Sequence, residues 1–214
     1  MKISKKMSFF NLLLLICFII WSLMVSNQTS FIKTFDQTVI RQVYHHNAFS
    51  LSIFRFLTSC GNTNTITILT IISVIILSLM KYFYAAGFVA INEITVSWIN
   101  HTIKMYVQRP RPEHHHYVYA GGYSFPSGHS AGSFALYISL LIIALFVFKK
   151  LSVKITLSLI AIGLVILIGY SRIFLGVHYP SDVVGGYLLA ATILIFTTLL
   201  FRAKNLSILK LKGI

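Results

Sequence analysis

The chain has 214 residues, of which 57% are hydrophobic and only 10% are charged, and its mean hydropathy is +0.82. This composition is typical of a protein with several membrane spans and excludes an ordinary soluble domain. The formal net charge of +14 does not indicate a nucleic-acid-binding protein, because the cations fall in short clusters at the ends of apolar segments rather than on one basic face.

Six apolar segments, separated by polar or basic stretches, predict an all-α membrane protein with six spanning helices in one bundle and a single domain over residues 1–214. The first segment covers residues 9–25 and follows a short basic stretch. No small-x-small cleavage site precedes Asn27, so we expect this segment to be retained as a helix rather than removed as a signal peptide. The other five segments are residues 66–80, 82–103, 128–148, 153–170 and 181–201.

The stretch between the first two spans, residues 26–65, is polar and mixed in character. Its parts 31–44 and 49–57 place apolar residues at helical spacing, which predicts two helices lying along the membrane surface. A second polar stretch, residues 108–127, joins the third and fourth spans. It is rich in Pro, Gly, His and Tyr and is expected to form a loop.

The distribution of lysine and arginine predicts how the spans are oriented. If the N-terminus is cytoplasmic, 11 of the 18 cations face the cytoplasm, as the positive-inside rule requires. These are Lys2, Lys5, Lys6, Lys81, Lys149, Lys150, Lys154, Arg202, Lys204, Lys210 and Lys212. Both termini are then cytoplasmic, and the segments after the third and fifth spans face outward. The plain composition and the lack of an evident targeting sequence lead us to expect a bacterial plasma membrane.

The outward ends of the third to sixth spans carry the residues with the clearest chemistry, among them several cations and two histidines. Arginine and lysine can clamp the oxygens of a phosphoryl group, and the free N–H groups at the start of a helix bind anions. A histidine followed by an aspartate four residues later, as in His178 and Asp182, is an oriented imidazole suited to act as a nucleophile or a base. A second histidine can protonate a leaving oxygen. The residues therefore predict phosphoryl transfer without a metal.

Three motifs in this region resemble the signature of the type 2 phosphatidic acid phosphatase superfamily. They are Lys-x6-Arg-Pro, Pro-Ser-Gly-His and Ser-Arg-x5-His-x3-Asp, and they occur in the family's order at the ends of membrane spans. The signature positions are filled by Lys104, Arg111, Pro112, Pro126, Ser127, Gly128, His129, Ser171, Arg172, His178 and Asp182. The resemblance covers about residues 82–201 and is to the integral-membrane lipid phosphatases of the family, because six apolar spans in so short a chain exclude its soluble acid phosphatases and haloperoxidases.

The resemblance implies a role for each of these residues. His178 would be the nucleophile that forms a phosphohistidine, Asp182 would orient His178, and His129 would be the general acid. No metal and no cofactor would be needed. The residues that would bind the phosphate are Lys104, Arg111, Ser127, Gly128 and Arg172.

We therefore expect an enzyme that removes a phosphomonoester or pyrophosphate headgroup from a lipid at the outer face of the membrane. Undecaprenyl pyrophosphate and phosphatidylglycerophosphate are the first candidate substrates, and phosphatidate and diacylglycerol pyrophosphate are alternatives. The expected partners are a lipid phosphate and the bilayer, with no nucleic acid. A lipid transporter would place its charges near the middle of the membrane, and a non-catalytic lipid-binding relative would have lost a motif position, so both fit less well.

Other polar residues have competing interpretations. Arg109 is too close to Lys104 to be the signature arginine, so we expect it to support the site from outside the phosphate contacts. The run 114–116 is all histidine and follows Glu113, which could hold zinc weakly, but a solvated loop is favoured. Glu93 lies about 16 Å from Lys104 along a helix, too deep to reach the phosphate directly, and a helix-packing role is as plausible for it as a functional one.

Overall fold

The computed structural model describes residues 5–203, and within this range all regular secondary structure is α-helical. The basic residues before Lys5 and the tail from residue 204, which the sequence predicts to be cytoplasmic, lie outside the described residues. The helices are α1 (Lys5–Ser26), α2 (Ser30–Val43), α3 (Ala48–Ser59), α4 (Thr63–Leu79), α5 (Phe83–Val107), α6 (Gly128–Val147), α7 (Leu151–Phe174) and α8 (Pro180–Ala203). Each of the six predicted apolar segments coincides, to within a few residues, with one of the long helices.

Four of these helices, α1, α6, α7 and α8, are long and apolar enough to cross a membrane by themselves. A fifth span results if α3 and α4 are counted together, since they follow each other with a bend of 45°. Helix α5 has 25 residues but carries polar side chains such as Asn92 and Glu93, which lower its hydropathy. The bundle is thus a multi-span membrane fold, while the predicted count of six spans is not confirmed by length and composition.

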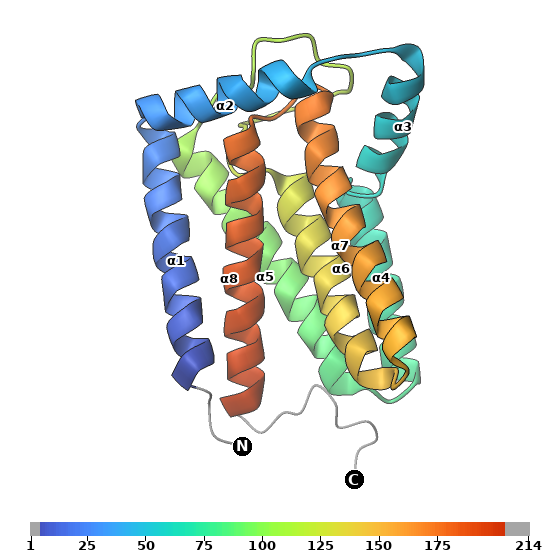
Figure 1. Cartoon of the computed structure of the whole chain (residues 1–214). Helices are drawn as coiled ribbons and strands as arrows, with labels where there is room; N and C mark the ends of the chain where they lie inside the picture. Colours follow the sequence, from blue (N-terminus) through green and yellow to red (C-terminus); the bar gives the residue numbers. More distant parts are fainter. Residues whose placement is uncertain (1–4, 204–214) are drawn as a thin grey trace.

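The long helices run side by side and leave α2 lying across one end of the bundle (Figure 1). This agrees with the surface helix predicted over residues 31–44. The helix predicted over residues 49–57 differs, because α3 turns along α7 instead of lying flat (Figure 1). Its Phe54 ring packs against Tyr170 and Phe174 of α7, with ring centroids 5.2 and 4.4 Å apart. Burial against these aromatic rings replaces contact with the membrane surface.

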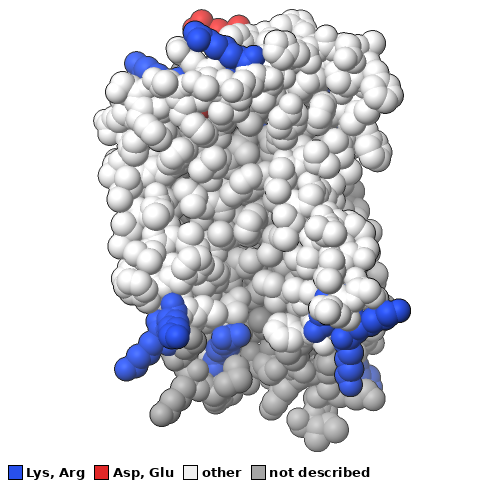
Figure 2. Space-filling view, in the orientation of Figure 1, with Lys and Arg blue, Asp and Glu red and all other residues white. Residues whose placement is uncertain are grey.

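The charged residues gather at the two ends of this bundle. Figure 2 shows lysine and arginine at both ends of the molecule, and a wide band between them that is free of charge on the face in view. An uncharged band suits the hydrocarbon core of a bilayer, which is about 30 Å thick. The end of the bundle that is covered by α2 lies opposite the described ends of the chain in α1 and α8 (Figure 1).

Helix α8 packs closely against the start of α6 because it has a glycine at the contact. A Cβ atom added to Gly186 would lie 2.7 Å from the carbonyl oxygen of Ser127 and 3.1 Å from the Cβ of Ser130. The backbone N–H of Ser127 also donates to the carbonyl of Asp182 in α8 (3.0 Å). The close approach therefore fixes where α6 begins relative to the first turn of α8.

We predict that Gly186→Ala lowers the stability of the protein by about 1–3 kcal/mol, because the added methyl group overpacks a backbone that cannot move aside. Gly163→Ala on α7 is the matched control, since nothing lies within 4 Å of a Cβ at that position. The control should be neutral or more stable by up to ~1 kcal/mol, from helix propensity. Thermal unfolding of the purified proteins in detergent measures both effects, and equal unfolding temperatures for the two variants would contradict this packing.

Candidate active site

The three sequence motifs meet at the end of the bundle that carries α2. Lys104 lies in the last turn of α5, Arg172 in the last turn of α7 and Asp182 in the first turn of α8. His178 follows in the short connection between α7 and α8, and His129 lies in the first turn of α6. Pro180 begins α8, where its fixed φ suits a first helical residue.

His178 is almost completely buried, with 2% of its surface exposed. Its Nδ1 lies 3.3 Å from Oδ2 of Asp182, and its Nε2 lies 3.2 Å from Nη1 of Arg111. Burial lowers the pKa of His178 to about 3, and this outweighs the opposing effect of Asp182. The imidazole is therefore neutral at pH 7. With the Nδ1 proton directed at Asp182, the lone pair of Nε2 is the one available for chemistry.

The carboxylate of Asp182 is completely buried and is held by donors from several segments. Its Oδ2 accepts from the backbone N–H of Tyr179 (2.8 Å), from the hydroxyl of Ser124 and from His178. Its Oδ1 accepts from Nη1 of Arg109 (2.6 Å). Arg109 and His178 thus contact different oxygens of Asp182. Arg109 binds the carboxylate and makes no contact with Nε2 of His178.

Three further cations surround His178 without a carboxylate of their own. Within residues 5–203, no Asp or Glu lies within ion-pair distance of Lys104, Arg111 or Arg172. Lys104 donates to the carbonyls of Tyr123 and Ser124, and Nη1 of Arg172 donates to the hydroxyl of Thr58 (2.6 Å). The Nε of Arg172 is buried and has no hydrogen-bond partner. These cations present an uncompensated positive charge that a phosphate can neutralise.

Arg111 is oriented by the loop 108–127. Its side chain donates to the carbonyls of Gly121 (2.8 Å) and Gly122 (3.1 Å) in that loop, and to the carbonyl of Val177 (2.6 Å). Burial lowers the pKa of Arg111 from its ordinary value, although Asp182 opposes this shift. The guanidinium is therefore held rigidly beside Nε2 of His178, as the signature arginine is expected to be.

Ser127 organises the start of α6. Its hydroxyl caps the helix by accepting from the N–H of Ser130, and its own N–H donates to the carbonyl of Asp182. The residue is completely buried, and its predicted contact with a phosphate stays a prediction. The N–H groups of Gly128 and His129 in the first turn have no acceptor within the helix and are the ones suited to an anion.

His129 is half-buried and is tethered to the N-terminal half of the chain. Its Nε2 lies 2.8 Å from Oδ1 of Asn62, the residue that precedes α4. A carbonyl oxygen accepts only from a protonated nitrogen, so this contact holds a proton on Nε2. The contact therefore selects the tautomer with its proton on Nε2 and fixes the orientation of the ring at the edge of the cationic cluster.

Four residues of this site were missed by sequence reasoning: Asp36, Thr58, Asn62 and Ser124. Three of them lie in the N-terminal third of the chain, where no motif indicates a function. Asp36 alone carried a signal, because the chain has only four acidic residues and a buried one needs a partner.

The histidine run after Glu113 does not converge on one point. His116 bonds the carbonyl of Pro112 (2.8 Å), His114 packs against Tyr44, and His115 packs against Tyr117. No cluster of three or more His, Cys, Asp or Glu suited to a metal ion occurs among residues 5–203. The rings contribute aromatic packing to the loop over the site.

Two cavities connect the cationic cluster with the side of the bundle. One, of about 250 Å³, is lined by Lys104, Gly128 and Glu93 among others. The second, of about 660 Å³, shares Glu93 and Ser97 with the first and is otherwise lined mostly by apolar residues of α4 and α5. Glu93 lines both cavities, and in the smaller one it shares the lining with Lys104 and Gly128. One of its carboxylate oxygens has no hydrogen-bond partner.

The fold and part of the sequence are similar to known phosphatases. The chain is 37% identical over 93 residues to phosphatidylglycerophosphatase B of Bacillus subtilis, covering 42% of this chain and 44% of that protein. It is 37% identical over 113 residues to undecaprenyl-diphosphatase BcrC of the same organism, covering 50% and 52%. The chain thus spans about half the length of these curated relatives.

Two crystal structures share the architecture. A transmembrane PAP2-type phosphatidylglycerolphosphate phosphatase of Bacillus subtilis superposes with a TM-score of 0.77 over 92% of this chain and 97% of the other, at 23% identity. LpxE of Aquifex aeolicus superposes with a TM-score of 0.62 over 76% and 93%, at 22% identity. The family model of the PAP2 superfamily matches residues 78–206, which includes all three motifs. The resemblance predicted from the motifs is confirmed, and the chain belongs to the PAP2 superfamily.

Proposed function

We propose that this protein is a membrane lipid phosphatase that hydrolyses a phosphomonoester or pyrophosphate headgroup through a phosphohistidine. The observation that carries the proposal is the environment of His178. A neutral imidazole, backed by Asp182 at Nδ1, presents Nε2 beside Arg111, near cations that have no carboxylate partner among the described residues. This is the arrangement that a nucleophile for phosphorus requires, because the cations neutralise the charge of the phosphoryl oxygens.

The reaction runs in two displacements. In the first, Nε2 of His178 attacks phosphorus, the bond to the leaving oxygen breaks, and His129 gives that oxygen a proton. In the second, water attacks the phosphohistidine and gives its proton to His129. The P–N bond breaks, and inorganic phosphate leaves with His178 neutral again. Asp182 stabilises the positive charge that the imidazole carries between the two steps.

A lipid substrate is supported by the cavities beside the site. The larger cavity is bordered by Ile71, Ile75 and Ile94, side chains about half or more exposed on the surface of the bundle. An acyl or isoprenoid chain can therefore remain among apolar side chains while its headgroup reaches Lys104. The relatives are named for phosphatidylglycerophosphate and undecaprenyl diphosphate, so we propose these two lipids as the first substrates to test.

We further propose that α1, the α3–α4 pair, α5, α6, α7 and α8 cross the membrane, with the site at its outer face. Helix α5 is less apolar than the others, but three of its polar residues, Asn92, Glu93 and Asn100, are buried inside the bundle. Polar groups in a span are tolerated when they face the protein interior. The distribution of cations between the two ends supports the outward orientation of the site.

The two histidines should respond differently to substitution. His178→Ala removes the nucleophile, so both turnover and the phosphoenzyme should disappear. His129→Ala removes only the proton donor, whose assistance is typically worth about 10²–10⁴-fold. An aryl phosphate, which has a good leaving group, should restore part of the activity of His129→Ala and none of that of His178→Ala. Phosphate release and acid-labile, base-stable label on the protein measure these effects; label on the His178→Ala protein would refute the mechanism.

Activity should be insensitive to chelation, because the cationic side chains take the role that a metal ion has in other phosphatases. The measurement is phosphate release from undecaprenyl pyrophosphate and phosphatidylglycerophosphate by purified protein, with and without EDTA. A loss of activity that zinc or magnesium restores would assign a catalytic metal and contradict the proposal.

The orientation is testable by labelling in intact cells. After replacement of Cys17 and Cys60, a cysteine at Tyr119, which is 95% exposed beside the site, should react with an impermeant thiol reagent added outside. A cysteine at Lys150, exposed at the opposite end, should react only after the cells are opened. The reverse pattern would place the site in the cytoplasm.

A further inference from the structure

Asp36 of α2 is a buried carboxylate outside the region that the family model matches. Only 3% of its surface is exposed. Its Oδ1 accepts from the backbone N–H of Ser181 (2.8 Å), and its Oδ2 accepts from the Ser181 hydroxyl (2.7 Å) and from Nη2 of Arg109 (2.8 Å). Both partners belong to the catalytic end of the bundle, and Ser181 directly precedes Asp182.

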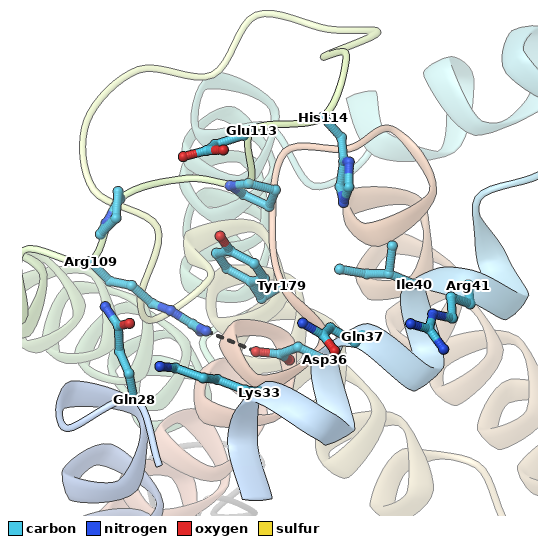
Figure 3. Close-up of a pocket in the computed structure, with 12 residues that line it drawn as sticks. Gln28, Lys33, Asp36, Gln37, Ile40, Arg41, Arg109, Glu113, His114 and Tyr179 are labelled. Atoms are coloured by element: carbon cyan, nitrogen blue, oxygen red, sulfur yellow. Dashed lines mark hydrogen bonds and ion pairs between the residues drawn. The ribbon is translucent and has the colours of Figure 1, made fainter. Parts of the chain in front are cut away.

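Arg109 connects Asp36 with Asp182. Its Nη2 donates to Asp36, while its Nη1 donates to Oδ1 of Asp182 (2.6 Å) and to the hydroxyl of Ser181 (2.8 Å). The guanidinium carbon lies 4.0 Å from the ring centroid of Tyr179. Figure 3 shows Arg109 extending below Tyr179 to meet Asp36 on α2. One guanidinium is therefore fixed on both sides, and its position fixes one oxygen of the carboxylate that faces His178.

We propose that Asp36 is a positioning residue for the phosphatase reaction: through Arg109 and Ser181 it sets the direction in which Asp182 faces His178. The inference rests on the proposed function, because it assigns Asp36 a part in that reaction. Asp182 uses Oδ1 for Arg109 and Oδ2 for His178. Holding Oδ1 in place fixes the plane of the carboxylate, and this directs Oδ2 at Nδ1.

The charges lead to the same conclusion. Without Asp36, Arg109 and Asp182 would form a neutral pair, and the imidazole of His178 would lie next to little net negative charge from this pair. With Asp36 ionised, the three groups carry one net negative charge beside His178. Burial raises the pKa of Asp36, and the hydrogen bonds from Arg109 and Ser181 oppose this shift and favour the carboxylate. The imidazole becomes positively charged once it has bonded phosphorus, so this negative charge stabilises the intermediate. The two carboxylates also raise the pKa of Arg109, although burial opposes them, and the bridging cation stays charged.

The test compares Asp36→Asn and Ser181→Ala with the parent protein. A misaligned catalytic group can lower a rate by about 10²-fold, so we expect Asp36→Asn to lower kcat by roughly 10–10²-fold with KM within about twofold of the parent. Ser181→Ala should lower kcat less, because the backbone N–H of Ser181 still binds Asp36. Glu113→Gln is the matched control: it also removes one negative charge, but from an exposed side chain, and should leave kcat unchanged.

A double-mutant cycle separates positioning from simple support of the fold. If Asp36 acts through Asp182, Asp36→Asn should lower kcat by less than about threefold in an Asp182→Asn background, because the effects of coupled residues are not additive. The proposal is wrong if Asp36→Asn lowers kcat equally in the parent and in Asp182→Asn and also lowers the unfolding temperature. Asp36 would then only hold α2 in place. A kcat within twofold of the parent for both Asp36→Asn and Ser181→Ala would also refute the proposal. Activity is measured on undecaprenyl pyrophosphate and on an aryl phosphate.

A spectroscopic measurement tests the same inference without turnover. In protein with ¹⁵N-labelled histidine, the His178 signals are identified by their loss in His178→Gln. We expect a proton on Nδ1 in the parent, and a shifted or mixed tautomer signal in Asp36→Asn but not in Glu113→Gln. An unchanged His178 signal in Asp36→Asn contradicts the positioning role. A parent protein that releases no phosphate from any substrate refutes the proposed function instead, and the two failures are distinguishable.

Discussion

The buried carboxylate of Asp182 is the group on which the arrangement of the site depends. Burying a carboxylate away from water lowers the stability of the fold by several kcal/mol unless hydrogen-bond donors or cations contact its oxygens. Asp182 receives donors from both ends of the loop between α5 and α6, through Arg109 and Ser124, and from Tyr179 just before its own helix. These segments cannot separate without leaving a charge unpaired. The same bonds leave Oδ2 directed at His178, so the stability of this region and the orientation of the imidazole have one cause.

The distribution of the few acidic residues leaves the candidate site rich in positive charge. The chain has four Asp and Glu residues, and two of them, Asp36 and Asp182, are held by the single cation Arg109. Among residues 5–203, Lys104, Arg111 and Arg172 have only neutral groups as hydrogen-bond acceptors, so their positive charges stay uncompensated. The proposed phosphate substrate would supply the missing negative charge. The positive charge of the site therefore depends on the scarcity of carboxylates as much as on the presence of arginines.

The sequence predicted the helices well, and the three motifs that it singled out meet at one end of the bundle. Apolar segments of membrane length must become helices, because backbone groups in hydrocarbon need internal partners, and the motifs lie at the ends of those helices. The contacts of Asp36, Thr58 and Asn62 were not predictable, because they join residues more than 60 positions apart and depend on which helix faces which. The cap that Ser127 forms on α6 follows from a short polar side chain directly before a long apolar helix. The course of α3 was missed because an amphipathic helix can bury its apolar face against aromatic rings as well as against lipid.

The bend between α3 and α4 has a consequence for protein engineering. Thr58 lies before the bend and holds Arg172, whereas Asn62 lies after it and holds His129. Together with Asp36, they place three supports of the site in a segment that the family motifs do not include. A hybrid protein that joins residues 78–206 to the N-terminal helices of a relative would keep every signature residue and lose these supports. For this chain, a graft of the motif region therefore needs the α2 and α3–α4 contacts along with the motifs.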